Sequence, residues 1–213
     1  MKIKILIPVF NDWQSVFKLL DEINLSLKNL EHEVSVIIIN DASNHDRKDE
    51  DKDFENINSV KILNMKINQG HARCIATGLK YIFEKEDFDY VIPMDGDGED
   101  RPEEILMLIN KNNENQNNSI VAKRVKRSEG IFFRTLYKVH KIITLIFTGH
   151  KINFGNFTLL TKKDILLINS KPSIWNSYSG TFKKYIKNYK EIDSIRGERY
   201  FGPSKMSIFK LLI

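Results

Sequence analysis

The stretch from Tyr90 to Asp100, with the sequence YVIPMDGDGED, decides the fold of this chain. A short apolar run, typical of a buried parallel strand, ends there in Asp95 and Asp97, two carboxylates separated by one residue. Gly96 and Gly98 predict a turn directly after the strand. Ligands of open α/β sheets bind at the carboxyl ends of the strands, where such carboxylates suit a divalent cation carrying phosphate oxygens. The stretch therefore predicts a metal-dependent site for a nucleoside diphosphate compound.

The acidic turn has two other interpretations. A glycine-rich acidic turn is also typical of a solvated loop without a ligand. A calcium EF-hand loop is disfavoured, because its sixth position requires glycine and is Asp100 here, and because a strand precedes it. The metal interpretation is favoured because other parts of the chain, taken independently, point to the same site.

The composition indicates one globular domain. The chain has 213 residues, of which 41% are hydrophobic and 29% charged, enough for one well-buried α/β domain. The single cysteine, Cys74, excludes a disulfide framework and is typical of a reducing cytosol. The N-terminal segment lacks the cleavage site of a secretory signal, and no stretch approaches the roughly 20 apolar residues of a membrane span. We therefore expect a cytoplasmic protein.

Positive charge gathers in one segment. Residues 123–151 contain eight lysines and arginines and a single acidic residue, Glu129, interleaved with aromatic and aliphatic side chains. Such a segment is a candidate for peripheral contact with the inner face of a membrane or with an anionic acceptor. A helix that buries its apolar face and leaves its lysines in water is an equally open interpretation. Nucleic acid is disfavoured as a partner, because no nucleic-acid motif accompanies the basic residues.

Apolar periodicity predicts alternating strands and helices up to residue 123, which indicates a mostly parallel sheet covered by helices. The predicted strands are Ile3–Val9, Val34–Asn40, Val60–Leu63, Tyr90–Met94 and Ile120–Lys123, and the helices are Trp13–Leu27, His71–Phe83 and Pro102–Asn110. A polar loop is predicted at Asn112–Asn118. Farther on, the pattern predicts helices at Phe132–Phe147, Lys163–Ile168 and Thr181–Asn188, and a short apolar segment at Phe157–Leu160.

Three further places carry candidate site residues. Adjacent parallel strands would bring Phe10 and Asp41 to one sheet edge, where a ring can stack on a base and a carboxylate can accept from a base N–H. The same residue types are also ordinary turn formers. A predicted helix begins after Gly70 with Arg73 on its first turn, a place that can bind a diphosphate. Small residues of that helix also serve close packing on the sheet.

The order and spacing of four motifs resemble those of the inverting family 2 glycosyltransferases. The motifs are IPVFND at residues 7–12, NDAS at 40–43, Asn68-x-Gly70, and MDGDGEDRPE at 94–103. The segment RYFGPSK at 199–205 is similar to the Arg-x-x-Gly-x-Ser-Lys segment of the polyprenyl-phosphate sugar transferases, the dolichol-phosphate mannose synthase-like branch. The resemblance implies a GT-A fold in a single domain, with residues 1–123 as the nucleotide-sugar half and 124–213 as the acceptor half.

The resemblance also implies the donor side of the site. It implies a UDP- or GDP-sugar donor and a Mg or Mn ion as cofactor. Asp41 matches the carboxylate that reads the donor base, Asp95 faces the donor sugar or ribose, and Asp97 ligates the metal. Glu99 stands where the branch commonly has a glutamine near the metal. The donor-binding set implied is Pro8, Phe10, Asp12, Asp41, Asn68, Gly70, Arg73 and Asp95, the metal set is Asp95 and Asp97, and the catalytic set is Asp95, Asp97 and Glu99.

On the acceptor side, the resemblance implies a lipid phosphate bound by basic residues of a flexible loop. The implied acceptor set is Arg124, Arg127, Asn156, Arg199, Ser204 and Lys205. An anionic phosphate needs no general base, and this suits Asn156, which stands where related enzymes have the aspartate of a Gly-Asp-Phe segment. A glycan hydroxyl acceptor would need a carboxylate base, for which Glu198 is only a placeholder. Asn40 likewise replaces the first aspartate of the usual Asp-Asp pair.

Other functions stay open at this point. A nucleotidyltransferase also needs metal and nucleotide on an α/β sheet, but it should have a glycine-rich phosphate loop near its N-terminus. A catalytically silent binding or scaffold member of the family is a further alternative. Many branch members continue into transmembrane helices after the Ser-Lys segment, so a chain ending at Ile213 is expected to be a soluble variant, a truncation or half of a two-chain system.

Overall fold

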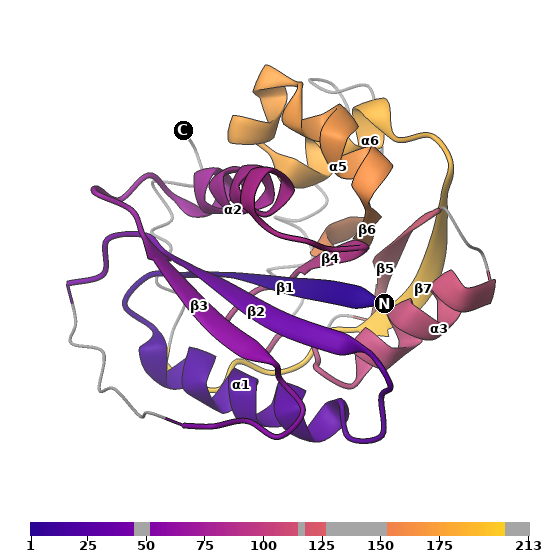
Figure 1. Cartoon of the computed structure of the whole chain (residues 1–213). Helices are drawn as coiled ribbons and strands as arrows, with labels where there is room; N and C mark the ends of the chain where they lie inside the picture. The colour runs from indigo at the N-terminus through magenta and orange to yellow at the C-terminus, as the bar shows by residue number, and fades with distance from the viewer. Residues whose placement is uncertain (45–51, 115–117, 127–152, 203–213) are drawn as a thin grey trace.

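A seven-stranded sheet forms the middle layer of the molecule (Figure 1). The structure, a computed structural model, describes residues 1–44, 52–114, 118–126 and 153–202. The strand order is β3-β2-β1-β4-β6-β5-β7. The strands are β1 (Lys2–Val9), β2 (Glu33–Asn40), β3 (Ser59–Asn64), β4 (Tyr90–Pro93), β5 (Ser119–Lys126), β6 (Phe154–Thr161) and β7 (Tyr189–Ile195).

Most neighbouring strands run parallel, which confirms the predicted sheet type. The pairs β1–β2, β2–β3, β1–β4 and β5–β7 are parallel, whereas β6 is antiparallel to both β4 and β5. Strands from both halves of the chain therefore share one sheet. Because β1, β2 and β4 run in the same direction, their carboxyl ends lie at the same edge, which is where the candidate site residues follow.

Helices cover both faces of the sheet (Figure 1). Alternate residues of β1 point to opposite faces: Ile5 and Ile7 join the core beneath α1 (Trp13–Ser26) and α3 (Glu104–Glu114), and Leu6 joins the other core. The second core lies beneath α2 (His71–Lys85), α5 (Lys162–Asn169) and α6 (Tyr178–Tyr185), with a 3₁₀ turn η1 (Pro172–Trp175) beside them. Burial on both faces explains the nearly continuous apolar runs of the central strands.

The predicted elements of the first half are confirmed, with shifted ends. The helix predicted from Pro102 begins at Glu104, because Pro102 belongs to a turn in which the N–H of Glu104 donates to the carbonyl of Arg101 at 3.0 Å. It continues to Glu114, so it includes the start of the predicted polar loop. Asn112 is buried there, and its amide donates to the carbonyl of Asn118 at 3.4 Å.

The second half differs more from the prediction. The apolar segment Phe157–Leu160 is part of β6, and α5 confirms the helix predicted at Lys163–Ile168. The helix predicted at Thr181–Asn188 begins earlier, at Tyr178, because the Ser177 hydroxyl accepts from the N–H of Gly180 at 3.1 Å as an N-cap. Strand β7 was not predicted. The helix predicted at Phe132–Phe147 lies outside the described residues.

No helix in the part of the chain that the structure describes is both long enough and apolar enough to cross a membrane.

Candidate active site

The acidic turn after β4 is braced by its own side chains. The backbone N–H of Asp95 donates to Oδ2 of Asp100 at 2.9 Å, and the N–H of Glu99 donates to Oδ1 of Asp97 at 3.0 Å. Asp100 is only 4% exposed, and burial, followed by the nearby charge of Asp95, raises its pKa to about 7. Gly98 has a φ of +89°, a conformation that glycine adopts without strain. The turn thus presents Asp95 and Asp97 from a fixed backbone.

Asp95 lies where the first and second halves of the chain meet. The side-chain amide of Asn156, on β6, donates to Oδ1 of Asp95 at 3.1 Å. Nε2 of His71, the first residue of α2, lies 3.3 Å from the same oxygen. Burial alone would raise the pKa of Asp95, but charge on His71 and Arg124 and the Asn156 hydrogen bond outweigh it and hold that pKa below its usual value. Asp95 is therefore ionised at neutral pH.

Asp97 faces a different partner, the guanidinium of Arg199. Arg199 donates from Nη1 to Oδ2 of Asp97 at 2.5 Å and from Nη2 to Oδ2 of Asp12 at 2.9 Å. Burial, followed by the charge of Asp95, raises the pKa of Asp97 in spite of Arg199. One arginine thus joins the start of α1, the acidic turn and the segment after β7, three places far apart in the sequence.

Residues 196–201, here called the C-terminal strap, lie across the acidic turn. Arg196 pairs with Glu99, and the N–H of Gly197 donates to the carbonyl of Glu99 at 2.9 Å. The N–H of Tyr200 donates to the carbonyl of Asp97 at 3.0 Å, and its ring lies directly over Gly98. These contacts attach the strap to the turn through both backbone and side chains.

The end of β7, from which the strap continues, is held by a buried carboxylate. Glu104, at the beginning of α3 and 2% exposed, accepts from the Ser194 hydroxyl at 2.6 Å and from the N–H of Ile195 at 3.0 Å. At the other end, the Tyr200 hydroxyl donates to Glu22 of α1, and the Lys18 ammonium lies 4.4 Å from the centre of the tyrosine ring. The strap is therefore part of the packed domain.

Asp41 organises the loop that leads into α2. Its carboxylate is 3% exposed and accepts from the backbone N–H groups of Gln69 and Gly70 at 2.7 and 2.8 Å. The amide of Asn68 donates to the Asp41 carbonyl at 3.2 Å. Gly70, with a φ of +90°, is the N-cap of α2. Asp41 therefore fixes the helix start that is a predicted diphosphate site, and its own predicted contact with the base stays a prediction.

We expect Asp41→Ala to loosen this loop as well as to weaken nucleotide binding. Two backbone donors lose a charged partner, which should lower the free energy of unfolding by about 1–3 kcal/mol. Urea denaturation measures that loss, and calorimetric titration of UDP and GDP measures the weaker binding. A loss of turnover with stability and nucleotide affinity unchanged would contradict both roles of Asp41.

Hydrogen bonds at the ends of two strands explain why residue 40 is an asparagine. Its Nδ2 donates to Oδ1 of Asn64, at the end of β3, at 2.8 Å, and its Oδ1 accepts from the N–H of Ser43 at 3.0 Å. An amide can donate and accept at once, whereas an ionised aspartate can only accept. The amide at this position thus ties two strand ends together.

The structure brings most of the predicted site residues to one sheet edge, in three connected groups. The groups are Asp95 with Asn156, Asp97 with Asp12 and Arg199, and Asp41 with Asn68 and Gly70. Pro8 is buried near the end of β1, Phe10 is half-buried just beyond it, and Arg73 is exposed and donates to Gln69. Arg127, Ser204 and Lys205 lie outside the described residues.

Arg124 is placed differently from the prediction. It lies within β5 and not in a flexible loop, with Nη2 3.5 Å from Oδ1 of Asp100. A side chain at Gly155 would meet the Arg124 guanidinium, since a Cβ built there lies 2.7 Å from Nη2. The bare Gly155 backbone therefore makes room for Arg124 beside the acidic turn.

Several residues of the site were not singled out from the sequence. They are His71, Asp100, Arg196 and Tyr200, which contact the acidic turn or brace it. Asp100 lies inside the motif at 94–103, Tyr200 lies inside the segment at 199–205, and His71 directly follows the motif at 68–70, so these positions were a signal for them. Arg196 and Tyr200 contact the turn from about 100 residues farther along the chain, a pairing that only the fold determines.

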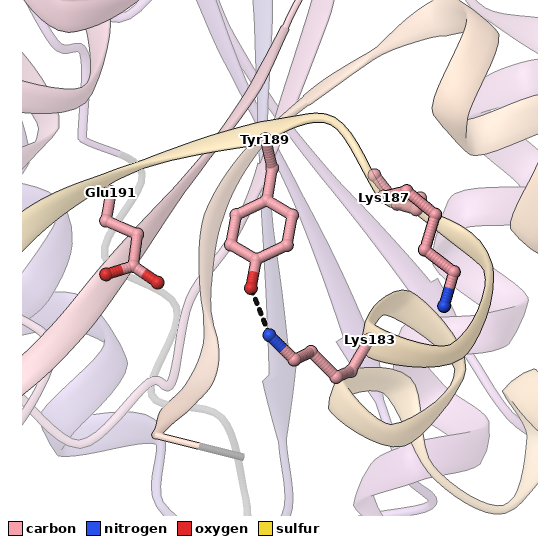
Figure 2. A pocket seen from close by; sticks show the side chains of 5 residues that line it. Lys183, Lys187, Tyr189 and Glu191 are labelled. Carbon is pink, nitrogen blue, oxygen red and sulfur yellow. Dashed lines mark hydrogen bonds between the residues drawn. The ribbon is translucent and has the colours of Figure 1, made fainter. Parts of the chain in front are cut away.

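A recess elsewhere on the molecule contains none of the predicted site residues. It has a volume of about 440 Å³ and lies between α6 and the edge strand β7, lined by Lys183, Ile186, Lys187, Tyr189 and Glu191. Figure 2 shows Lys183 reaching the Tyr189 hydroxyl across it. The candidate active site is thus defined by converging side chains at the sheet edge and not by this recess.

The acidic turn fits a divalent cation. Asp95 and Asp97 offer oxygen ligands, and Mg²⁺ is usually held by one or two carboxylates together with substrate phosphates. Burial, followed by the charge of Asp95, raises the pKa of Asp97, so a cation bound beside it would favour its ionised form. Among the described residues, no group of three or more His, Cys, Asp and Glu side chains is placed to hold a metal. Any metal held here would need further ligands from the substrate or from water.

Comparison with known proteins defines the class of protein. The model of the family described as Glycosyl transferase family 2 matches residues 4–199, so the chain belongs to glycosyl transferase family 2. It is 27% identical over 218 residues to undecaprenyl-phosphate 4-deoxy-4-formamido-L-arabinose transferase from Proteus mirabilis. That match covers 99% of this chain but 64% of the relative, so the chain spans less than two thirds of the relative's length. The family and branch resemblance inferred from the motifs agree with these matches.

Solved structures confirm the GT-A fold. Glucosyl-3-phosphoglycerate synthase from Mycobacterium tuberculosis, in complex with Mn²⁺, UDP and phosphoglyceric acid, is similar with a TM-score of 0.59 and 12% identity. That match covers 94% of this chain and 72% of the other. The mannosyltransferase PcManGT from Pyrobaculum calidifontis, in complex with GDP-Man and Mn²⁺, has a TM-score of 0.54 and 14% identity, covering 91% and 54% of the two chains.

Proposed function

We propose that this chain transfers a sugar from a nucleoside diphosphate donor to a polyprenyl phosphate, with inversion at the anomeric carbon. The observation that carries the proposal is the contact between Asn156 and Asp95: at the acceptor-side position the chain has an amide that donates, where a base would have to accept. A phosphate acceptor is already an anion, so it needs no base at this position. The undecaprenyl-phosphate transferase relatives support the same acceptor class.

The other carboxylates of the site already accept from nearby donors. Asp97 and Asp12 accept from Arg199, and Glu99 pairs with Arg196. Glu198, the placeholder base, is exposed. This arrangement supports an acceptor that brings its own negative charge to the reaction.

On the donor side, Asp95 and Asp97 are the residues that would hold Mg²⁺ or Mn²⁺. When bound, the cation would offset the charge that develops on the departing nucleoside diphosphate. Asp41 and Asn68 place the loop before α2, whose N-terminus offers backbone N–H groups to an anion. The Mn²⁺ complexes of the two similar structures, one with UDP and one with GDP-Man, support this class of donor without choosing between the two nucleotides.

A transfer assay tests the proposal directly. The purified chain is incubated with Mn²⁺, liposomes containing undecaprenyl phosphate, and a panel of radiolabelled UDP- and GDP-sugars. We expect label from one donor to appear in a lipid product that mild acid cleaves, as a glycosyl phosphodiester should. Label in an acid-stable glycan would instead support the hydroxyl acceptor. Metal-dependent nucleotide binding without any transfer or donor hydrolysis would support the scaffold alternative.

We expect the double substitution Arg124→Ala and Arg127→Ala to spare nucleotide binding and to reduce transfer to lipid phosphate by about 10–100-fold, the range expected for losing charge-assisted contacts of a few kcal/mol. Kinetics over a range of lipid phosphate concentrations measure the loss. The matched control is Lys123→Ala, which removes a charge from the same strand, where Lys123 pairs with Glu191 at 3.3 Å. Normal transfer by the double variant would show that these arginines do not serve the acceptor.

A further inference from the structure

We propose that His71 and Asn156 form a positioning pair that holds the carboxylate of Asp95 in its working orientation. The family resemblance implies no such role for either side chain: it implies that Asn156 contacts the acceptor, and it implies no role for His71. The role rests on the proposed function, because it concerns the same transfer site. Its evidence is the convergence of two side chains, His71 from α2 and Asn156 from β6, on one carboxylate oxygen of Asp95 in the acidic turn.

The contacts form a closed triangle. Nδ2 of Asn156 lies 2.7 Å from Nε2 of His71 and 3.1 Å from Oδ1 of Asp95, and the His71 nitrogen lies 3.3 Å from that same oxygen. The two protons of one amide nitrogen can serve both neighbours when the imidazole is neutral. When it is protonated, the ring donates to Asp95 and no longer accepts from Asn156, so the amide is left with Asp95 as its acceptor. In either state Oδ1 is engaged, and the lone pairs of Oδ2 are left for a donor or a cation.

The backbone sets each corner of the triangle. Strands β4 and β6 pair Tyr90 with Thr161 and Val91 with Leu160, and the same antiparallel register continued past the strand end places Asp95 opposite Asn156. His71 directly follows Gly70, whose N–H is held by the buried Asp41 carboxylate. The pair therefore rests on two rigid supports, the β6 backbone and the start of α2.

Asp95 needs such support because of its place in the turn. The hydrogen bond from its N–H to Asp100 fixes the backbone of Asp95 but not its side chain, which is 21% exposed. A carboxylate that must meet a substrate within a fraction of an ångström gains from neighbours that lock its rotamer. An amide at position 156 can do this for an ionised Asp95. A carboxylate there would place two negative charges about 3 Å apart, which is a destabilising arrangement.

Two amide substitutions with side chains of different length test the positioning role of His71. The amide of His71→Gln extends to about the position of Nε2, whereas that of His71→Asn reaches only about the position of Nδ1. We expect His71→Asn and His71→Ala to lower kcat for transfer by about 10–100-fold, as loss of an orienting partner does, with the Kd for UDP or GDP changed less than about threefold. His71→Gln should stay within about threefold of wild type. Lys80→Gln, on the exposed face of α2, is the control and should leave kcat unchanged.

The pair also predicts non-additive effects. The double variant His71→Ala with Asn156→Ala should lose no more kcat than the worse single variant, because each member acts through the same carboxylate. Independent losses that multiply would overturn the pair. So would a wild-type kcat in His71→Ala, or a Gln variant as poor as the Asn variant.

A spectroscopic measurement keeps this test separate from the proposed function. The ¹⁵N side-chain amide resonance of Asn156, assigned by its loss in Asn156→Ala, should shift in His71→Ala and His71→Asn and stay near its wild-type position in His71→Gln. An unmoved resonance in all three variants would overturn the contact even if transfer occurs. If wild type transfers no sugar to lipid phosphate, the proposed function fails, while this resonance and the rate of donor hydrolysis still test the pair.

Discussion

Asp97→Asn should abolish sugar transfer, by about 10²–10³-fold or more, without destabilising the protein. Burial and the charge of Asp95 already raise the pKa of Asp97, which means that the folded state disfavours its ionised form. A neutral amide of nearly the same shape relieves that cost, and its oxygen can still accept from the N–H of Glu99. Arg199 keeps its second partner, Asp12, at 2.9 Å. The negative charge of Asp97 therefore lowers stability, and the same charge would bind the cation of the nucleotide donor.

The difference in stability between wild type and Asp97→Asn should change with pH in a definite direction. A carboxyl whose folded pKa lies above its unfolded value of 3.8 stabilises the fold fully below 3.8 and loses that contribution as pH rises through the folded pKa. The free energy of unfolding of wild type should therefore fall relative to that of Asp97→Asn as pH rises from acid to neutral. Urea denaturation of both proteins across this range measures the difference.

Calorimetry with UDP, GDP and Mn²⁺ completes the test of Asp97. The control is Asp193→Asn, which removes an exposed carboxylate from β7 and should change neither binding nor stability. Metal-dependent nucleotide binding in Asp97→Asn equal to that of wild type would refute the assignment of Asp97 to the cation. A large drop in melting temperature would show instead that its ion pair with Arg199 is mainly structural.

The sequence predicted the first half of the fold well because the physical signals there are local. The alternation of Ile5, Leu6 and Ile7 between two cores and the single apolar face of α1 are properties of contiguous residues. Strand β7 was missed because it lies at the sheet edge and its sequence, YKEIDSI, is mostly polar. Only Ile192 and Ser194 are buried along it, so its alternation is too weak to identify a strand.

The candidate site was predictable in its residues but not in its pairings. Asp95 and Asp97 could be identified because a strand that ends in carboxylates and glycines is informative within a few residues. Nothing local indicates that Arg199 bridges Asp97 and Asp12, or that His71 faces Asp95. Those contacts depend on the strand order and on the antiparallel register of β6, which are set by the packing of the whole domain.

Gly98→Ala should be among the most damaging single substitutions in this chain, although it adds one methyl group. Gly98 has a φ of +89°, and a Cβ built there lies 2.5 Å from the Tyr200 ring. Backbone strain and overpacking each cost about 1–3 kcal/mol, so we expect a loss of about 2–6 kcal/mol in the free energy of unfolding. Because Tyr200 cannot stay over the turn, the C-terminal strap should detach and withdraw Arg199 from Asp97.

A double-mutant cycle with Tyr200→Ala separates the two costs. Removing the ring removes the clash but not the strain at φ +89°, so Gly98→Ala should cost only about 1–2 kcal/mol in the Tyr200→Ala background. Tyr200→Phe is the control, because it keeps the ring over Gly98 and removes only the hydroxyl. That hydroxyl donates to Glu22. An equal cost of Gly98→Ala in both backgrounds would show that the ring does not hold the strap to the turn. The contrasting outcome is a stability cost of Gly98→Ala that is smaller in the Tyr200→Ala background than in wild type. If the single variant Gly98→Ala also loses nucleotide binding, the donor site requires the docked strap, because Gly98 and Tyr200 are where strap and turn meet.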